Sequence, residues 1–293
     1  MKIEDLHLFV EVAKEASLRN AAVRLSMQPG TLSKAIKRIE DYYQHELFDR
    51  TGHGWQLTPA GKLLRERAVE LLGIHEKIEF ELGNPRRCHV RVSGPAGVLA
   101  HYLPTVVNRL STHQADHSLD IKIAPDLSPL LKHQVDIALT TTLAGQSVAL
   151  PSIYSEKICD VPFVIVASKH HPLAIHVATH SQPIDIQTVL THPFIVPSHP
   201  VYGHTVENSS EDGWFDSEFK RKITARVDDI STLIALVNTQ SWLAYMPQYL
   251  AEHEQLPIIK TRGCPYACVQ SIWLCRQKNV QYHWIHQLFQ EED

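Results

Sequence analysis

Five cations without a nearby acid form the strongest chemical signal in the sequence. Residues 16–39 hold Arg19, Arg24, Lys34, Lys37 and Arg38 and no aspartate or glutamate, whereas residues 1–15 set two lysines against four acids. Positive groups gathered in one segment attract phosphate, but such a block is also typical of a solvated helix face. Charge alone leaves both interpretations open. Because the net charge of the chain is −4, any nucleic-acid site must be local.

The other reactive residue types form no recognised site. The nineteen histidines include close pairs, but no pair has a third ligand at a metal-binding spacing. Five cysteines at irregular spacing indicate reduced thiols rather than a disulfide framework. Cys264 and Cys268 are either buried thiols or a redox-sensing pair. No phosphate-binding loop, dinucleotide-binding or hydrolase motif occurs, so the sequence predicts no enzyme, no metal site and no cofactor.

Three short helices are predicted to position the cations. Apolar residues recur at helical spacing in three stripes separated by breakers, the last being Pro29 and Gly30. The stripes are Leu6, Phe9, Val10 and Ala13; Ala21, Ala22 and Leu25; and Leu32, Ile36, Ile39 and Tyr43. Ser33, Lys34 and Lys37 face away from the third stripe. A helix-turn-helix needs this division, because one helix face is buried while the other enters the major groove.

A two-stranded ribbon and a long helix are predicted next. Leu47 to Arg50 lead through a glycine-containing turn to Trp55 and Leu57, which is typical of a wing. Arg50 and His53 would then lie beside the DNA backbone or minor groove. Thr58 can cap the following helix and Pro59 can begin it, and its apolar pattern runs to about Leu82.

That long helix carries a repeat typical of a coiled coil. Its seam consists of Leu64, Ala68, Leu71, His75, Ile78 and Leu82, at alternating spacings of three and four. Dimerisation is the favoured interpretation, and packing against the chain's own C-terminal domain is the alternative. A histidine in the seam is either a polar residue that fixes the register or a pH sensor. A breaker at residues 84–87 ends the segment.

The C-terminal two hundred residues alternate short apolar runs with helical patterns, in two series. This predicts parallel sheets covered on both faces and two α/β subdomains with a cleft between them. Strand ends and helix starts would present free N–H groups to a ligand there. No apolar run reaches the length of a membrane span, and the acidic start differs from a signal peptide, so we expect a cytoplasmic protein.

Several motifs in register resemble the LysR-type transcriptional regulators. They are PGTLSKAIKRIE from Pro29 to Glu40, LFDR from Leu47 to Arg50, LTPAG from Leu57 to Gly61 and, more weakly, VDIAL from Val135 to Leu139. The resemblance implies a winged helix-turn-helix, a dimerising linker helix and a periplasmic-binding-protein-like effector domain that pairs further into a homotetramer. The departures are Gln28 for a Ser or Thr cap, Gln44 for a glycine, His53 for an arginine, and Gln240 and Trp242 for two glycines.

The expected fold class is therefore an all-α N-terminus followed by an α/β effector domain. We expect the DNA-binding domain at residues 1–58, the linker helix at 59–83 and the effector domain at 88–293. Subdomain I would take about 88–160 and 265–293, and subdomain II about 161–264. The predicted function is a sequence-specific transcriptional regulator whose operator binding or bending responds to a small polar or anionic effector. The alternative is an enzyme with an N-terminal interaction module. Expected partners are double-stranded DNA, a second copy of the chain and RNA polymerase.

Two further sets of site residues follow from these predictions. The DNA-binding set is Arg19, Gln28, Pro29, Thr31, Ser33, Lys34, Lys37, Arg38, Arg50 and His53. The effector set, by resemblance to the family's domain, is Ser93, Gly94, Ala96, Ser128, Thr141, His199 and Tyr202. Hydroxyls and helix-start N–H groups in this set favour an anionic or polar ligand, and the bulk of Trp242 is expected to narrow the site.

Overall fold

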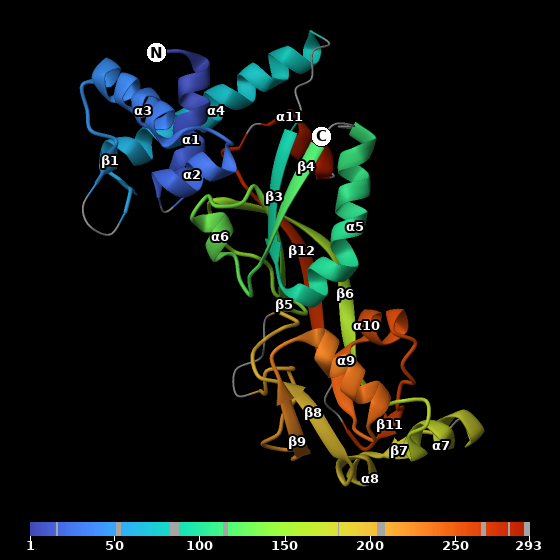
Figure 1. Ribbon diagram of the computed structural model, residues 1–293. Helices are drawn as coiled ribbons and strands as arrows, with labels where there is room; N and C mark the ends of the chain where they lie inside the picture. The colour runs from blue at the N-terminus through green and yellow to red at the C-terminus, as the bar shows by residue number, and fades with distance from the viewer. Residues whose placement is uncertain are drawn as a thin grey trace.

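A computed structural model describes residues 1–15, 17–50, 54–82, 88–113, 117–180, 182–203, 209–264, 268–280 and 282–289. It consists of a helical N-terminal domain, one long helix and a two-part α/β domain (Figure 1). The predicted combination of a winged helix-turn-helix with a two-subdomain effector domain is confirmed. His53 lies outside the described residues.

The N-terminal domain is built from α1 (Ile3–Lys14), α2 (Leu18–Arg24) and α3 (Pro29–Tyr43), with a wing of β1 (Phe48–Asp49) and β2 (Gln56–Leu57). In the wing, Phe48 pairs with Leu57 in antiparallel register. The predicted stripe of α3 is buried at Leu32, Ile36 and Ile39, each 0% exposed. The prediction that Tyr43 belongs to this buried stripe is wrong, because its side chain is 40% exposed. The end of α3 lies beyond the core, and residues 41–46 are all exposed.

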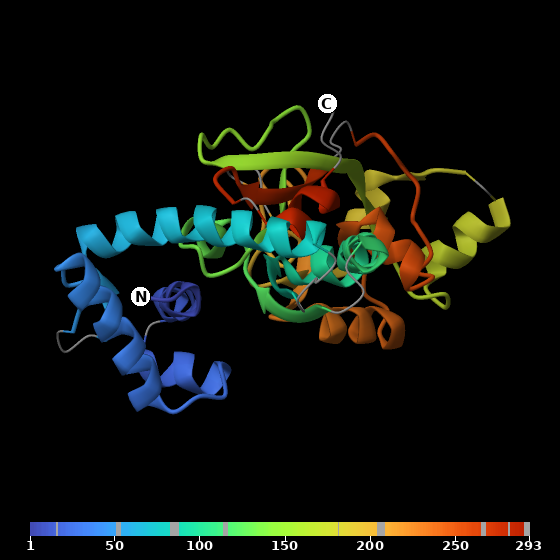
Figure 2. The ribbon, with the colours of Figure 1, turned by 90° about the horizontal axis from the view of Figure 1, so that it is seen from above.

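The long helix α4 (Pro59–Glu81) begins where the sequence predicts. Thr58 caps it, because its Oγ1 accepts a hydrogen bond of 3.0 Å from the Gly61 N–H. Gly61 also lets the helix approach the wing closely, since a Cβ there would lie 2.1 Å from the carbonyl oxygen of Leu47. Seen from above, α4 runs as a rod from the DNA-binding domain toward the effector domain (Figure 2). This close contact fixes the direction in which the helix leaves the wing.

The effector domain holds a six-stranded sheet in the order β10-β6-β12-β5-β3-β4. Its strands are β3 (Cys88–Gly94), β4 (His117–Ile123), β5 (Ile137–Leu143), β6 (Ile153–Val166), β10 (Ala244–Pro247) and β12 (Val269–Gln277). Strand β3 is parallel to β4 and β5, but β12 is antiparallel to β5 and β6. The expectation of parallel sheets is therefore wrong for β6, β10 and β12. The physical reason is that β6 carries the chain out to the second subdomain and β12 carries it back.

The remaining elements surround these strands. In the first subdomain they are α5 (Ala96–His113), α6 (Ser128–Leu131) and α11 (His283–Leu288). In the second they are α7 (Pro172–His180), β7 (Ile184–Asp185), α8 (Ile186–Leu190), β8 (Pro193–Pro197), β9 (Lys222–Val227), α9 (Ile230–Thr239), α10 (Gln248–His253) and β11 (Thr261–Arg262). The second subdomain lies at the end of the molecule away from the DNA-binding domain (Figure 1). Within the described ranges, no helix is long and apolar enough to cross a bilayer.

Candidate DNA-binding surface and effector cavity

The outward face of α3 presents cations to solvent. Thr31, Lys34 and Lys37 are exposed and Ser33 is half-buried, while the opposite face of the helix is packed on α1 and α2. Of the remaining predicted DNA contacts, exposed positions are Arg19, Gln28, Pro29, Arg38 and Arg50. Among the described residues, Arg19, Lys34 and Lys37 have no acidic partner. Their charge is therefore free to meet phosphate.

Two other predicted DNA contacts are already held by carboxylates. The guanidinium of Arg38 pairs with Asp5, whose side chain is 3% exposed. This hydrogen bond lowers the pKa of Asp5. Arg50 pairs with Glu40 and lies 4.8 Å above the centre of the Trp55 ring. These pairs fix the geometry of α3 and the wing, which places Arg38 and Arg50 in positioning roles beside any contact with DNA.

The predicted seam of α4 divides between two sides of the helix. Ala68 is 2% exposed and is buried within the protomer. His75 lines a cavity between α4 and the effector domain. By contrast, Leu71, Ile78 and Leu82 are 45%, 48% and 74% exposed. The exposed apolar stripe of α4 therefore comprises Leu63, Leu71, Ile74, Ile78 and Leu82.

A group of buried charges joins the DNA-binding domain to the effector domain. Arg91, in β3, is paired with Glu11 of α1 at 3.2 Å and with Asp136 at 3.3 Å. Lys14 of α1 completes the group, 2.9 Å from Glu11 and 3.8 Å from Asp136. All four side chains are at most 11% exposed. A second pair, between Arg24 and Asp120 at 3.0 Å, lies at the edge of the same interface.

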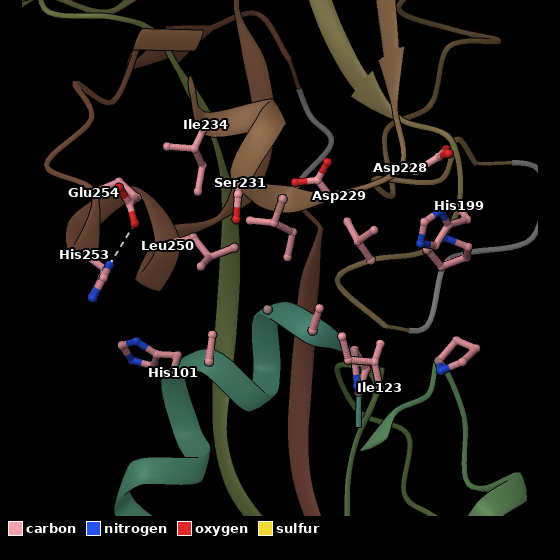
Figure 3. Close-up of a pocket in the computed structure, with 18 residues that line it drawn as sticks. His101, Ile123, His199, Asp228, Asp229, Ser231, Ile234, Leu250, His253 and Glu254 are labelled. Atoms are coloured by element: carbon pink, nitrogen blue, oxygen red, sulfur yellow. Dashed lines mark hydrogen bonds and ion pairs between the residues drawn. The ribbon is translucent and has the colours of Figure 1, made fainter. Parts of the chain in front are cut away.

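A cavity of about 540 Å³ lies between the two effector subdomains (Figure 3). It is the size of a small-molecule site. The first subdomain contributes the start of α5, with Ala96, Gly97, Ala100 and His101, and the segment around Ile123. The second subdomain contributes residues 199–201, 228–231, 234, 250 and 253–254. The starts of α5 and α9 meet closely, since a Cβ on Gly97 would lie 3.1 Å from Cδ1 of Ile230.

The charged groups that line this cavity are acidic. Its carboxylates are Asp228, Asp229 and Glu254, and no lysine or arginine lines it among the described residues. Asp229 caps α9 by accepting a hydrogen bond of 2.8 Å from the Thr232 N–H, and such bonds lower its pKa. Asp228 accepts a hydrogen bond from the Ser198 hydroxyl. These carboxylates therefore line the cavity without a lysine or arginine beside them among the described lining residues.

Three histidines complete the wall. Burial lowers the pKa of His101, and the nearby His253 lowers it further. The His101 ring stacks on Tyr249 with 4.5 Å between centroids. His253 Nδ1 lies 3.0 Å from Glu254 Oε1. His199 stands with Asp228 on the other side of the cavity (Figure 3). At neutral pH, His101 is thus an uncharged part of the wall.

The predicted effector residues fall into two groups. Ala96 and His199 line the cavity. Ser93, Thr141 and Tyr202 are buried at 0%, 5% and 1% exposure, and Gly203 closes over Thr141. The other predicted residues, Gly94 and Ser128, do not line the cavity, and neither does Trp242. The cavity residues that the sequence did not indicate are His101, Asp228, Asp229, His253 and Glu254. The run Asp228-Asp229-Ile230-Ser231 is a helix-start signal that could have identified two of them.

Both halves of the chain match one family of regulators. Residues 3–62 match the model "Bacterial regulatory helix-turn-helix protein, lysR family", and residues 83–289 match "LysR substrate binding domain". The chain belongs to the LysR family of transcriptional regulators. Since both matched domains are regulator domains, the regulator interpretation holds and the enzyme alternative is set aside.

Relatives of this LysR-family regulator cover most of its length. The malolactic fermentation system transcriptional activator of Lactococcus lactis is 25% identical over 249 residues, which are 84% of this chain and 81% of the relative. A variant of full-length OxyR from Pseudomonas aeruginosa superposes with a TM-score of 0.64 at 18% identity, covering 98% and 96% of the two chains. Full-length CbnR in complex with its target DNA superposes with a TM-score of 0.51 at 14% identity, covering 98% of this chain and 97% of CbnR. These structures support the fold.

Proposed function

We propose that this LysR-family regulator reads its operator with α3, binds as a dimer through α4, and responds to a small effector in the cavity between the subdomains. The observation that carries the proposal is the outward face of α3, where Lys34 and Lys37 are exposed and have no acidic partner in the described part of the chain. We place the protein in the cytoplasm, where its DNA target lies. RNA polymerase is a further partner expected of such a regulator.

In this proposal, some residues attract the DNA phosphates and others contact the base edges. Lys34, Lys37 and Arg19 supply phosphate attraction, and Thr31 and Ser33 reach base edges. The start of α3 also brings Gln28 and Pro29 close to the backbone. Arg38 and Arg50 position α3 and the wing beside this contact. His53 lies outside the described residues and stays a predicted contact. Phosphate contacts of this kind set the register on the duplex, while hydroxyl groups provide sequence preference.

The exposed stripe of α4 supports self-association. Five large apolar side chains on one helix face are costly to leave in water, and pairing two such faces would bury them. A pair of α4 helices also joins two α3 helices, which suits an operator with two half-sites. Relative to the sequence prediction, this proposal retains Leu71, Ile78 and Leu82 and replaces Leu64, Ala68 and His75 with Leu63 and Ile74. Further pairing into a homotetramer rests on the family resemblance.

The buried charges between the domains provide a path from effector to DNA. Glu11 and Lys14 belong to α1, which packs directly on α3. Arg91 lies in β3, which leads through Pro95 into the start of α5 at the cavity. A ligand that shifts the start of α5 therefore acts on a strand that is tied by ion pairs to the DNA-binding domain.

Gel retardation tests the DNA-binding proposal. The full chain should retard the DNA upstream of its own gene at moderate salt and should retard a shuffled sequence far less. Lys37→Ala should weaken this retardation, and Lys222→Ala, an exposed lysine of the second subdomain, provides the matched control. Equal retardation of both DNAs by the wild type would contradict sequence-specific binding.

A further inference from the structure

We infer that the cavity between the subdomains takes a small ligand with a protonated nitrogen and an apolar body. The inference rests on the proposed effector role of that cavity and names the chemical class of its ligand. Of the two alternatives that the sequence favours, a small polar or an anionic effector, it excludes the anionic one.

The charged residues of the cavity wall determine the sign of the charge on the ligand. Asp228, Asp229 and Glu254 line the cavity, and the described lining contains no lysine or arginine to balance them. Asp228 accepts a hydrogen bond from an uncharged hydroxyl and Asp229 accepts one from a backbone N–H, so neither of these donors is a cation. An ammonium group of the ligand would supply the missing counter-charge and donate hydrogen bonds to the remaining carboxylate lone pairs.

Groups that could hold an anion are weaker here. The start of α5 carries only a partial positive charge, of about half an elementary charge. The start of α9 is already occupied by its own cap, Asp229. Burial lowers the pKa of His101, so its ring is uncharged at neutral pH, and His253 faces Glu254. Because the described lining holds three carboxylates and no lysine or arginine, a carboxylate ligand without an amine is disfavoured.

The apolar residues of the lining determine which kind of body the ligand carries beside its amine. Ile230, Ile234 and Leu250 from the second subdomain face Ala100 and Ile123 from the first. In Figure 3, Ile234 and Leu250 stand between the carboxylates at the two ends of the cavity. A branched or ring-shaped hydrocarbon body would bury its apolar surface against these side chains. The site therefore fits an amine whose body is compact and apolar.

A matched panel tests the ligand class. The panel holds 3-methylbutylamine, cyclohexylmethylamine and 2-phenylethylamine, each beside the carboxylate and the alcohol with the same body. At millimolar concentration and neutral pH, at least one amine should raise the melting temperature of the full chain by a few degrees. Its carboxylate counterpart should bind at least tenfold more weakly. A carboxylate that binds as well as its amine, or no shift with any amine, would overturn the inference.

Variants locate the effect in the cavity. Asp228→Asn/Asp229→Asn removes two charges and keeps the α9 cap, because asparagine caps as well as aspartate does. It should weaken amine binding at least tenfold and leave binding of the matched alcohol within about twofold. Asp185→Asn changes a capping aspartate of α8 outside the cavity and should leave amine binding unchanged. Unchanged amine binding by the double variant would also overturn the inference.

Retardation of the upstream DNA by ligand-free protein separates this inference from the proposed function. Normal retardation without any amine binding would refute the ligand class and leave DNA binding intact. Amine binding that leaves retardation unchanged would support the ligand class and refute the effector role. Loss of retardation in the ligand-free wild type would refute the proposed function alone.

Discussion

The outward face of α3 and the cavity between the subdomains carry opposite charges. On α3, Lys34 and Lys37 are exposed without acidic partners, whereas Asp228, Asp229 and Glu254 line the cavity without a lysine or arginine among the described residues. The net charge of −4 for the whole chain indicates neither the cationic face of α3 nor the acidic cavity. The difference teaches that local charge, rather than the total, assigns the partner: phosphate at one end of the molecule and an amine in the cavity.

The two regions are joined by the buried charges around Arg91. If that connection is real, breaking it should have the largest effect on stability. Arg91→Met leaves the buried carboxylate of Asp136 without its nearest cation, with Lys14 at 3.8 Å, and this should cost about 3–5 kcal/mol in the free energy of unfolding. Chemical denaturation measures that decrease.

Two variants control for this result. Lys157→Met breaks an ion pair whose side chains are 42% and 48% exposed, and it should cost less than about 1 kcal/mol. Arg91→Met/Asp136→Asn removes the unpaired charge as well and should recover part of the stability. If Arg91→Met is as mild as Lys157→Met, the two regions are not joined through this group in solution.

Self-association provides the next test of the difference between the two regions. Operator binding by the DNA-binding half should depend on it, whereas ligand binding in the cavity should not. Leu71→Asp places a carboxylate in the exposed stripe of α4, and two copies would meet in a dimer at a cost of several kcal/mol. Light scattering should show fewer subunits, and operator affinity should fall while amine binding persists. The control is Lys62→Asp, which changes an exposed residue of α4 outside the stripe. A Leu71→Asp protein of wild-type mass and affinity would refute the α4 interface.

A region is easier to predict from sequence when its residues come from one segment than when they come from several. The buried face of α3 was predictable because Leu32, Ile36 and Ile39 follow each other at helical spacing within one segment. The cavity was not, because its lining comes from separate segments between Pro95 and Glu254 that only the folded sheet brings together. Ala96 and His199, the two predicted effector residues that line the cavity, belong to segments that the family resemblance marks.

Misplaced residues have equally local causes. Helical spacing assigned Tyr43 to the core, but spacing cannot reveal where the neighbouring helices end. In the predicted seam of α4, Ala68 fits the repeat but is buried within its own protomer, because spacing alone does not show which side of the helix the protomer covers. Tyr202 was expected in the open site, but Gly203 approaches Thr141 so closely that this part of the cleft is filled.

The smallest expected effect concerns the end of α3. Gln44 has a φ of 54°, in the left-handed region that glycine adopts without steric cost. Gln44→Gly should therefore stabilise the DNA-binding domain by about 1 kcal/mol and leave amine binding in the cavity unchanged. Thermal denaturation measures the gain, with Gln56→Gly, an exposed wing position, as a control that should not stabilise. A decrease in stability in Gln44→Gly would show that its side chain, which donates a hydrogen bond to the Asp41 carbonyl, outweighs the backbone cost.

The salt dependence of operator binding tests most directly whether the outward face of α3 is the DNA contact. Each phosphate interaction that a substitution removes should decrease the magnitude of the slope of log affinity against log salt by about 0.9. Lys34→Ala and Lys37→Ala should each show this decrease on the upstream DNA, whereas Lys222→Ala should keep the wild-type slope. If both α3 variants keep that slope as well, these lysines do not contact phosphate and the account of this surface is wrong.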